Sequence, residues 1–171
     1  MSQVILETER LVLSTWGKNG ADEMFALHSD PEVNHFVTSY NQDWSLTKAA
    51  ERIAVWQTEF AELGLGKHRV TRKIDGAFVG RAGFSVPHEG QPELGYSLAR
   101  AHWGQGYASE IAAALRDWFF ATRTDPSFIG FAHRNNLASR RVLEKIGMTE
   151  THEAEVAGAP HRFYIKQRTT P

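Results

Sequence analysis

The chain contains no cysteine, and this absence excludes several kinds of chemistry. Disulfide bonds, metal sites built from thiolates and a cysteine nucleophile are all ruled out. The 171 residues carry 19 basic and 20 acidic side chains, a formal net charge of −1. Without a general excess of positive charge, nothing in the composition favours nucleic acid as a partner. The eight histidines show no paired ligand spacing, so we expect no metal site.

Long apolar runs are also missing. The longest uninterrupted aliphatic run, residues 111–115, is far shorter than the roughly 20 residues of a membrane-spanning helix. The start of the chain, MSQVILETER, lacks the positive charge and apolar segment of a secretory signal. We therefore expect a cytoplasmic protein without a membrane partner. A hydrophobic content of 42% predicts a packed core, and the length predicts one domain over residues 1–171.

The spacing of apolar residues predicts strands and helices in alternation. Strands are expected at 11–16, 68–74, 78–86, 93–98, 128–132, 149–156 and 162–166. Helices are expected around 24–27, from 45 to about 64, after Gly106 and at 138–146. The order β-α-α-β-β-β-α-β-α-β-β predicts an α/β fold (α+β, with a mixed sheet) that carries helices on both faces.

A glycine turn follows the strand expected at 93–98. Gly104-Gln105-Gly106 opens directly into a long amphipathic helix. Glycine lets the backbone approach an anion closely, and a helix N-terminus favours negative charge, so the turn predicts a site for a phosphate-bearing ligand. Taken alone, it is equally typical of a tight strand-to-helix connection that binds nothing. It is not a Walker loop, and Ser109 at the third glycine position disfavours a nucleotide-dependent oxidoreductase.

A second helix start lies one strand further along. Asn135 and Asn136 are good N-cap residues, and Gly147 is a good residue to end the helix. Taken alone, Asn136 and Ser139 are also typical of a plain N-cap followed by a small surface residue. Two such helix starts, one strand apart, together predict a ligand-binding arrangement.

At these residues the chain resembles the GNAT superfamily of acyl-CoA N-acyltransferases, in particular the RimJ/RimL-like branch of ribosomal-protein N-acetyltransferases. The resemblance covers nearly the whole length. It is carried, in the order of the family, by residues 6–11, 79–83, 93–96, 103–110, 136–139 and 144–148. Each motif is weak by itself, whereas all of them in order at family-like spacings are specific.

The resemblance implies acetyl-CoA as cosubstrate and no metal. It places the pyrophosphate on backbone amides from Gln105 to Ser109 and the pantetheine arm beside Asn136. Trp103 stands where the family more commonly has glutamine or arginine, which removes one side-chain contact. The residues expected to bind the cosubstrate are Tyr96, Ser97, Leu98, Trp103, Gly104, Gln105, Gly106, Tyr107, Ala108, Ser109, Asn136 and Ser139.

The resemblance also implies catalytic roles. Many family members have a tyrosine seven residues after the asparagine as acid for the departing thiolate, but that position is Leu143 here. The RimL-like branch instead assigns the sulfur to Ser139, one helical turn after Asn136. Glu93 and Glu155 are the candidate bases. For Glu93 the alternative is a surface carboxylate paired with a lysine or arginine.

The sequence thus predicts an acetyl-CoA-dependent N-acetyltransferase in which a primary amine attacks directly within a ternary complex. The resemblance implies that a backbone N–H near Leu98, where the sheet of the family splays, polarises the thioester carbonyl. The acceptor is expected to be a small-molecule amine or a peptide N-terminus, with residues 30–36, Tyr40, Trp44 and 153–162 at its pocket. The alternative is a CoA-binding regulatory or scaffold domain without turnover. The sequence makes no prediction of the oligomeric state.

Overall fold

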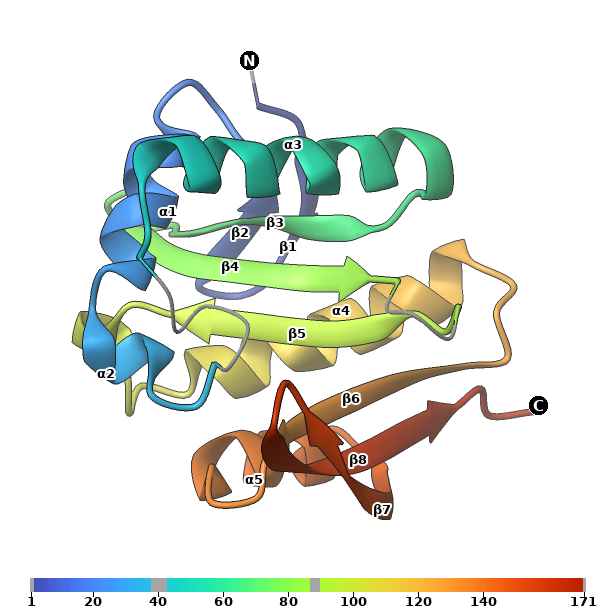
Figure 1. The fold of residues 1–171 in the computed structure, drawn as a ribbon. Helices are drawn as coiled ribbons and strands as arrows, with labels where there is room; N and C mark the ends of the chain where they lie inside the picture. The colour runs from blue at the N-terminus through green and yellow to red at the C-terminus, as the bar shows by residue number, and fades with distance from the viewer. Residues whose placement is uncertain (1, 38–42, 87–89, 171) are drawn as a thin grey trace.

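The computed structural model describes residues 2–37, 43–86 and 90–170. A mixed sheet of eight strands forms its centre, in the order β1-β2-β3-β4-β5-β6-β8-β7. Helices α1 and α3 lie on one face of this sheet, and α4 and α5 lie on the other (Figure 1). The predicted α/β fold with a mixed sheet is therefore confirmed.

The strands and helices have the following bounds. The strands are β1 (Val4–Glu7), β2 (Leu11–Ser14), β3 (Gly66–Arg72), β4 (Phe78–Ser85), β5 (Glu93–Leu98), β6 (Ser127–His133), β7 (Thr149–Val156) and β8 (Ala159–Gln167). The helices are α1 (Gly20–His28), α2 (Pro31–Asn34), α3 (Leu46–Leu63), α4 (Tyr107–Thr122) and α5 (Leu137–Lys145), with a 3-10 turn η2 (Arg100–His102).

Two short elements are additional to the predicted order. Strand β1 pairs with β2 at the edge of the sheet, where only one side of the strand has a partner. Helix α2 begins at the Asp30-Pro31 pair, which the sequence marked only as a break. Asp30 caps this helix by accepting a hydrogen bond from the N–H of Glu32, and Pro31 occupies the first turn. The same pair that ends one helix therefore starts another.

Strands β5 and β6 separate soon after they meet. They are parallel but share a single register pair, Glu93 with Ile129. On its other side each strand remains fully paired. Strand β5 pairs with β4 along its whole length, and β6 pairs with β8 along its whole length. Figure 1 shows the two ribbons diverging from this point. The divergence leaves backbone groups of both strands without a strand partner.

The alternation of an antiparallel ladder identifies these groups. The N–H of Ala99 donates to the carbonyl of Val79 at 2.8 Å, so odd-numbered residues of β5 face β4. The N–H groups of Tyr96 and Leu98 therefore point toward the side of β6, where no register pair exists. The sheet thus presents backbone donors at the opening that it creates.

Two buried histidines make the stability of this fold depend on pH. Burial lowers the pKa of His68 to about 4, and burial together with the nearby Arg81 lowers the pKa of His28 to about 3. In the unfolded chain both return to an ordinary value of about 6.5. Between these values the unfolded chain binds more protons than the folded protein, so the free energy of unfolding falls as the pH drops below about 6.5.

We expect His68→Leu to weaken this dependence, because leucine fills a similar volume and takes up no proton. Each histidine contributes up to about 1.4 kcal/mol per pH unit. Urea unfolding at pH 6 and pH 5 should therefore show a loss of stability that is smaller in the variant by about 1 kcal/mol. The exposed His152, changed to leucine, is the control. Equal losses in His68→Leu and the wild type would contradict the assignment.

Candidate active site

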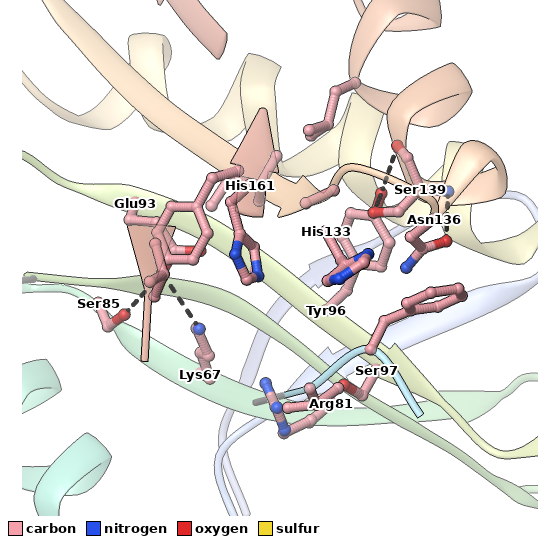
Figure 2. Close-up of a pocket in the computed structure, with 18 of the residues that line it drawn as sticks. Lys67, Arg81, Ser85, Glu93, Tyr96, Ser97, His133, Asn136, Ser139 and His161 are labelled. Atoms are coloured by element: carbon pink, nitrogen blue, oxygen red, sulfur yellow. Dashed lines mark hydrogen bonds and ion pairs between the residues drawn. The ribbon is translucent and has the colours of Figure 1, made fainter. Parts of the chain in front are cut away.

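A cavity of about 510 Å³ lies where β5 and β6 separate (Figure 2). Its described walls come from β3, β4 and β5, the end of β6, helices α3 and α5, the segment after α2, and the β7–β8 hairpin. Polar side chains reach it from both faces of the sheet. The gap between β5 and β6 is therefore a pocket whose wall contains carboxylate, hydroxyl and imidazole side chains, which are groups suited to acid–base chemistry.

The glycine turn lies just beyond the C-terminal end of β5. Gly104 and Gly106 have φ angles of 71° and 80°, the left-handed region that glycine adopts without strain. Gly106 is the N-cap of α4, and no side chain caps this helix. The N–H groups of Tyr107, Ala108 and Ser109 therefore begin the helix as donors without an intrahelical partner. Such a helix start fits an anion.

Side chains from the start of the chain hold this turn in place. Arg10 Nη1 donates to the carbonyl of Gln105 at 2.9 Å, and Arg10 Nε donates to Glu110 Oε2 at 2.7 Å. The Thr8 hydroxyl donates to the other oxygen of Glu110 at 2.6 Å. The predicted motif at residues 6–11 thus has a physical role, because it fastens the β1–β2 turn to the first turn of α4.

Trp103 connects the turn to the end of β5. Its indole N–H donates to the carbonyl of Leu98 at 2.8 Å. Leu98 and residues 103–109 are not among the described residues that line the cavity. They lie instead at and beyond the C-terminal end of β5, here called the outer end of the opening between β5 and β6. An anionic tail would sit there if the reacting end of a ligand entered the pocket.

Tyr96 and Ser139 meet in the wall of the cavity. The phenol oxygen of Tyr96 lies 3.1 Å from Ser139 Oγ and donates to the Ser139 carbonyl at 3.3 Å (Figure 2). Asn136 fixes this turn, since its side chain accepts a hydrogen bond from the Ser139 N–H at 3.2 Å. Burial raises the pKa of Tyr96 to about 12, so the phenol keeps its proton. The pair therefore consists of two neutral hydroxyls that can donate hydrogen bonds.

Glu93 lies in the cavity wall rather than on the surface. Its Oε2 accepts hydrogen bonds from the Lys67 ammonium at 3.3 Å and from the Ser85 hydroxyl at 3.1 Å. The absence of a side chain at Gly95 makes room for this arrangement, because a Cβ there would collide with the Lys67 ammonium. The expected pairing with a lysine exists, but it is buried beside the proposed reaction site.

His161 presents a lone pair to the cavity. Its Nδ1 lies 2.8 Å from the carbonyl of Ala159, and because a carbonyl only accepts, Nδ1 carries the hydrogen. In the neutral ring Nε2 is then an acceptor, and no described residue hydrogen-bonds to it. The ring is 3% exposed, lines the cavity and packs against His133 at 5.5 Å between centroids. His161 is thus held in one tautomer.

The comparison with known families agrees with this geometry. A family model described as the acetyltransferase (GNAT) domain matches residues 10–149. This chain belongs to the GNAT family. Membership makes the protein an acyltransferase.

Individual relatives extend the match. The chain is 31% identical over 147 residues to the uncharacterized protein YkkB of Bacillus subtilis (strain 168), which covers 84% of both chains. A putative GNAT-family acetyltransferase from Bordetella pertussis has a similar structure, with a TM-score of 0.82 and 25% identity over 96% of this chain and 99% of that one. RimL, a ribosomal L7/L12 alpha-N-protein acetyltransferase in complex with coenzyme A, gives a TM-score of 0.80 at 16% identity, over 96% and 98% of the chains. The likeness to RimL shows the fold alone.

The structure of this GNAT protein keeps one candidate base away from the pocket. Glu155 is exposed on β7, opposite Pro160, and is not among the described residues that line the cavity. Successive side chains of a strand point to opposite faces, and it is the neighbouring Val156 that lines the cavity. Proximity in sequence to the hairpin therefore does not bring Glu155 to the reacting groups.

Residues expected at the acceptor pocket divide in the same way. Phe36 and His161 line the cavity, whereas Trp44 stacks on His28 with 4.8 Å between ring centroids. Tyr40 lies outside the described residues. The sequence predicted that the segment 153–162 lies at this pocket, but it did not identify His161 within that segment.

Arg81 is a further cation of the cavity wall that the sequence did not single out. It lies within the motif at residues 79–83, and its Nε donates to His28 Nε2 at 3.0 Å. Its guanidinium lies over the ring of Trp56, 5.2 Å from the centroid. Because His28 has a pKa near 3, it serves Arg81 as a neutral acceptor at ordinary pH.

Two features are absent from the part of the chain that the structure describes. No group of three or more histidine, aspartate or glutamate side chains there is placed to hold a metal ion. No helix there combines the length and apolar character needed to span a membrane.

Proposed function

We propose that this protein transfers the acetyl group of acetyl-CoA to the α-amine of a small molecule or a peptide N-terminus, by direct attack in a ternary complex. The observation that carries the proposal is the opening between β5 and β6. An uncapped helix start lies at its outer end, a hydroxyl pair lies in its wall and a polar cavity lies within.

Acetyl-CoA fits the residues at the outer end. The backbone N–H groups from Gln105 to Ser109 would hold the pyrophosphate, because Gly106 offers no side chain to cap or block them. The pantetheine arm would then run between the separated strands toward Asn136. RimL, which has a similar fold, forms a complex with coenzyme A, and this supports CoA as the class of ligand.

The chemistry divides among groups on both sides of the gap. The N–H of Leu98 polarises the thioester carbonyl and stabilises the oxygen that gains charge as the amine attacks. The neutral amine attacks the carbonyl carbon and forms the C–N bond, and the C–S bond then breaks. The Ser139 hydroxyl, supported by Tyr96, hydrogen-bonds to the departing sulfur, and the proton that the nitrogen loses as the amide forms passes to this sulfur to give the CoA thiol. Positioning of both reactants supplies much of the acceleration.

We propose that His161 Nε2 takes up the proton that the acceptor ammonium must lose before the neutral amine can attack. The hydrogen bond from Nδ1 to Ala159 fixes the tautomer in which Nε2 accepts. Glu93 contributes a carboxylate that favours a positive amine nearby, but its Oε2 already accepts from Lys67 and Ser85. His161 Nε2 accepts no hydrogen bond from a described residue, so its lone pair is more available for a proton than Glu93 Oε2 is. A role for Glu155 as base finds no support in its exposed position.

The alternative of a CoA-binding domain without turnover does not fit membership of this family of acyltransferases. The observation in favour of this alternative is Leu143, which stands where many family members have a tyrosine and cannot protonate a thiolate. The hydroxyls of Tyr96 and Ser139 supply the missing donors from a different strand and helix. A scaffold function has no need of them.

A pair of matched peptides tests the proposal. One has a free N-terminus and no lysine, and the other is blocked at the N-terminus and has one internal lysine. We expect the free N-terminus to be acetylated at least tenfold faster at pH 7, because an α-amine has a pKa of about 7.7–8.0 against about 10.4 for lysine. Mass spectrometry of the products and release of free CoA thiol measure the difference. Faster acetylation of the blocked peptide would overturn the α-amine assignment.

A further inference from the structure

A carboxylate in the first turn of α4 lies close to the glycine turn that is proposed to bind the pyrophosphate. Glu110 is the fourth residue of this helix, and the side chains of a helix lean toward its N-terminus. Burial acts to raise the pKa of the Glu110 carboxyl, but hydrogen bonds from Thr8 and Arg10 outweigh it and lower the pKa, so the group is ionised. A negative charge opposes the binding of an anion nearby. The presence of Glu110 at this place therefore calls for a reason other than its charge.

The Glu110 carboxylate is occupied by donors from the start of the chain. Its Oε1 accepts from the Thr8 hydroxyl at 2.6 Å and from the backbone N–H of Arg10 at 2.9 Å. Its Oε2 accepts from Arg10 Nε at 2.7 Å, and Arg10 Nη2 lies 2.7 Å from the same oxygen. Hydrogen bonds between charged partners are the strong ones. Two nitrogens of one guanidinium on one oxygen fix the orientation of the Arg10 side chain.

Arg10 reaches the glycine turn with its third nitrogen. Nη1 donates to the carbonyl of Gln105 at 2.9 Å, and the guanidinium lies over the ring of Tyr107, 4.5 Å from the centroid. In a trans peptide the C=O and the following N–H point in opposite directions. The bond to Arg10 therefore directs the N–H of Gly106 to the side away from Arg10. One side chain thus sets the orientation of the peptide that leads into the uncapped start of α4.

We propose that Arg10 and Glu110 are positioning residues for acetyl-CoA, and that their ion pair holds the Gln105–Gly106 peptide and the first turn of α4 in the conformation that receives the pyrophosphate. This inference rests on the proposed function, since it takes the turn as the pyrophosphate site. A turn that is ordered in the free protein loses less conformational entropy when the ligand binds. The ion pair acts through the backbone of the turn and takes no part in bond making.

Glu110→Gln separates positioning from charge, because the two predict opposite results. The change keeps the shape of the side chain and removes a negative charge near the bound anion. Charge alone would make acetyl-CoA bind more tightly. Loss of the ionised acceptor instead releases Arg10 from its fixed orientation and frees the Gln105–Gly106 peptide. We expect calorimetric titration to give at least tenfold weaker binding of acetyl-CoA.

Arg10→Lys tests the other partner of the ion pair. Lysine keeps the positive charge, but its single ammonium lacks the rigid fork that meets Glu110 and the Gln105 carbonyl at once. We expect a similar loss of acetyl-CoA affinity. In the double variant Arg10→Lys/Glu110→Gln the two losses should not add, because both changes break the same contact. In steady-state kinetics the loss should fall on the KM for acetyl-CoA rather than on kcat.

Glu7→Gln is the matched control. Glu7 lies on β1, and its carboxylate pairs with Lys73 at 2.8 Å rather than with a residue of the turn. The same chemical change there should leave the acetyl-CoA affinity at the wild-type value. Circular dichroism checks that each variant is folded, and either single variant decides the question if the other does not fold.

The possible results are distinguishable. Unchanged or tighter binding in a folded Glu110→Gln or Arg10→Lys would overturn the positioning role, and so would losses that add in the double variant. Wild-type protein that does not bind acetyl-CoA would overturn the proposed function and this inference with it. Weaker binding in both single variants, without acetylation of either test peptide by the wild type, would support the positioning role and contradict the proposed α-amine transfer.

Discussion

Replacement of His161 by glutamine is expected to lower kcat about 100-fold at pH 7, the usual contribution of a positioned general base. Glutamine is polar and of similar size, but it cannot take up the proton of the acceptor ammonium. Acetyl-CoA binding should change little, because the ring lies on the acceptor side of the cavity. Steady-state kinetics with the peptide that has a free N-terminus, together with calorimetry of acetyl-CoA, measure the two effects.

The pH dependence of this defect identifies its cause. Above about pH 8 an α-amine is mostly neutral in solution, so the need for a base declines and the deficit of His161→Gln should shrink. Ser139→Ala provides the contrast. It should lower kcat at every pH by a constant factor, because it affects the departing sulfur and not the attacking amine.

A matched control guards against an unspecific effect of losing a histidine. His152 is exposed on β7, and His152→Gln should retain wild-type kinetics. If His161→Gln retained more than half of the wild-type kcat at pH 7, the base would have to be sought elsewhere, with Glu93 as the next candidate.

Gly106→Val is expected to weaken acetyl-CoA binding at least tenfold, or by about 1.4 kcal/mol. The φ angle of 80° at Gly106 lies in the region that a β-branched residue resists. A side chain there would also stand at the uncapped start of α4 and 3.4 Å from Arg10 Nη2, which helps to hold the turn. Calorimetric titration with acetyl-CoA gives the affinity, and circular dichroism checks that the variant is folded.

Gly64→Val is the control for backbone strain. Gly64 has a φ angle of 67° at the end of α3, and its nearest contact is Arg123, just past the far end of α4. Valine should strain the backbone there to a similar degree without reaching the turn. We expect lower stability and unchanged acetyl-CoA affinity in Gly64→Val. Unchanged affinity in a folded Gly106→Val would remove the turn from the binding site.

The local patterns of the sequence were sufficient for the architecture. The apolar spacing of α3 and α4 and the glycines around the turn depend on neighbours along the chain, so they can be interpreted without a structure. The order of strands and helices followed from them, except for β1 and α2, which are each only four residues long. The four residues of α2 make only one helical turn and so show no period, and the apolar residues of β1 (Val4, Ile5 and Leu6) are consecutive rather than alternating.

The chemistry of the pocket was decided by contacts between distant residues. Tyr96 and Ser139 are 43 positions apart, and Lys67 and Glu93 are 26 apart. Their meeting depends on the separation of β5 from β6 and on the seating of α3 and α5 over that gap. Glu155 shows that closeness in sequence is not enough. Its side chain is exposed to solvent, whereas that of the next residue on β7, Val156, lines the cavity.

The sequence by itself therefore determined the family resemblance, the mixed sheet and the glycine turn, because each depends on patterns among residues that are close together in the sequence. Only the tertiary structure decided which hydroxyl, imidazole and carboxylates share the cavity. Hydrogen bonds such as those of Tyr96 with Ser139 and of Glu93 with Lys67 form between groups that are far apart in the sequence. A linear pattern gives the residue types but not the distances between them.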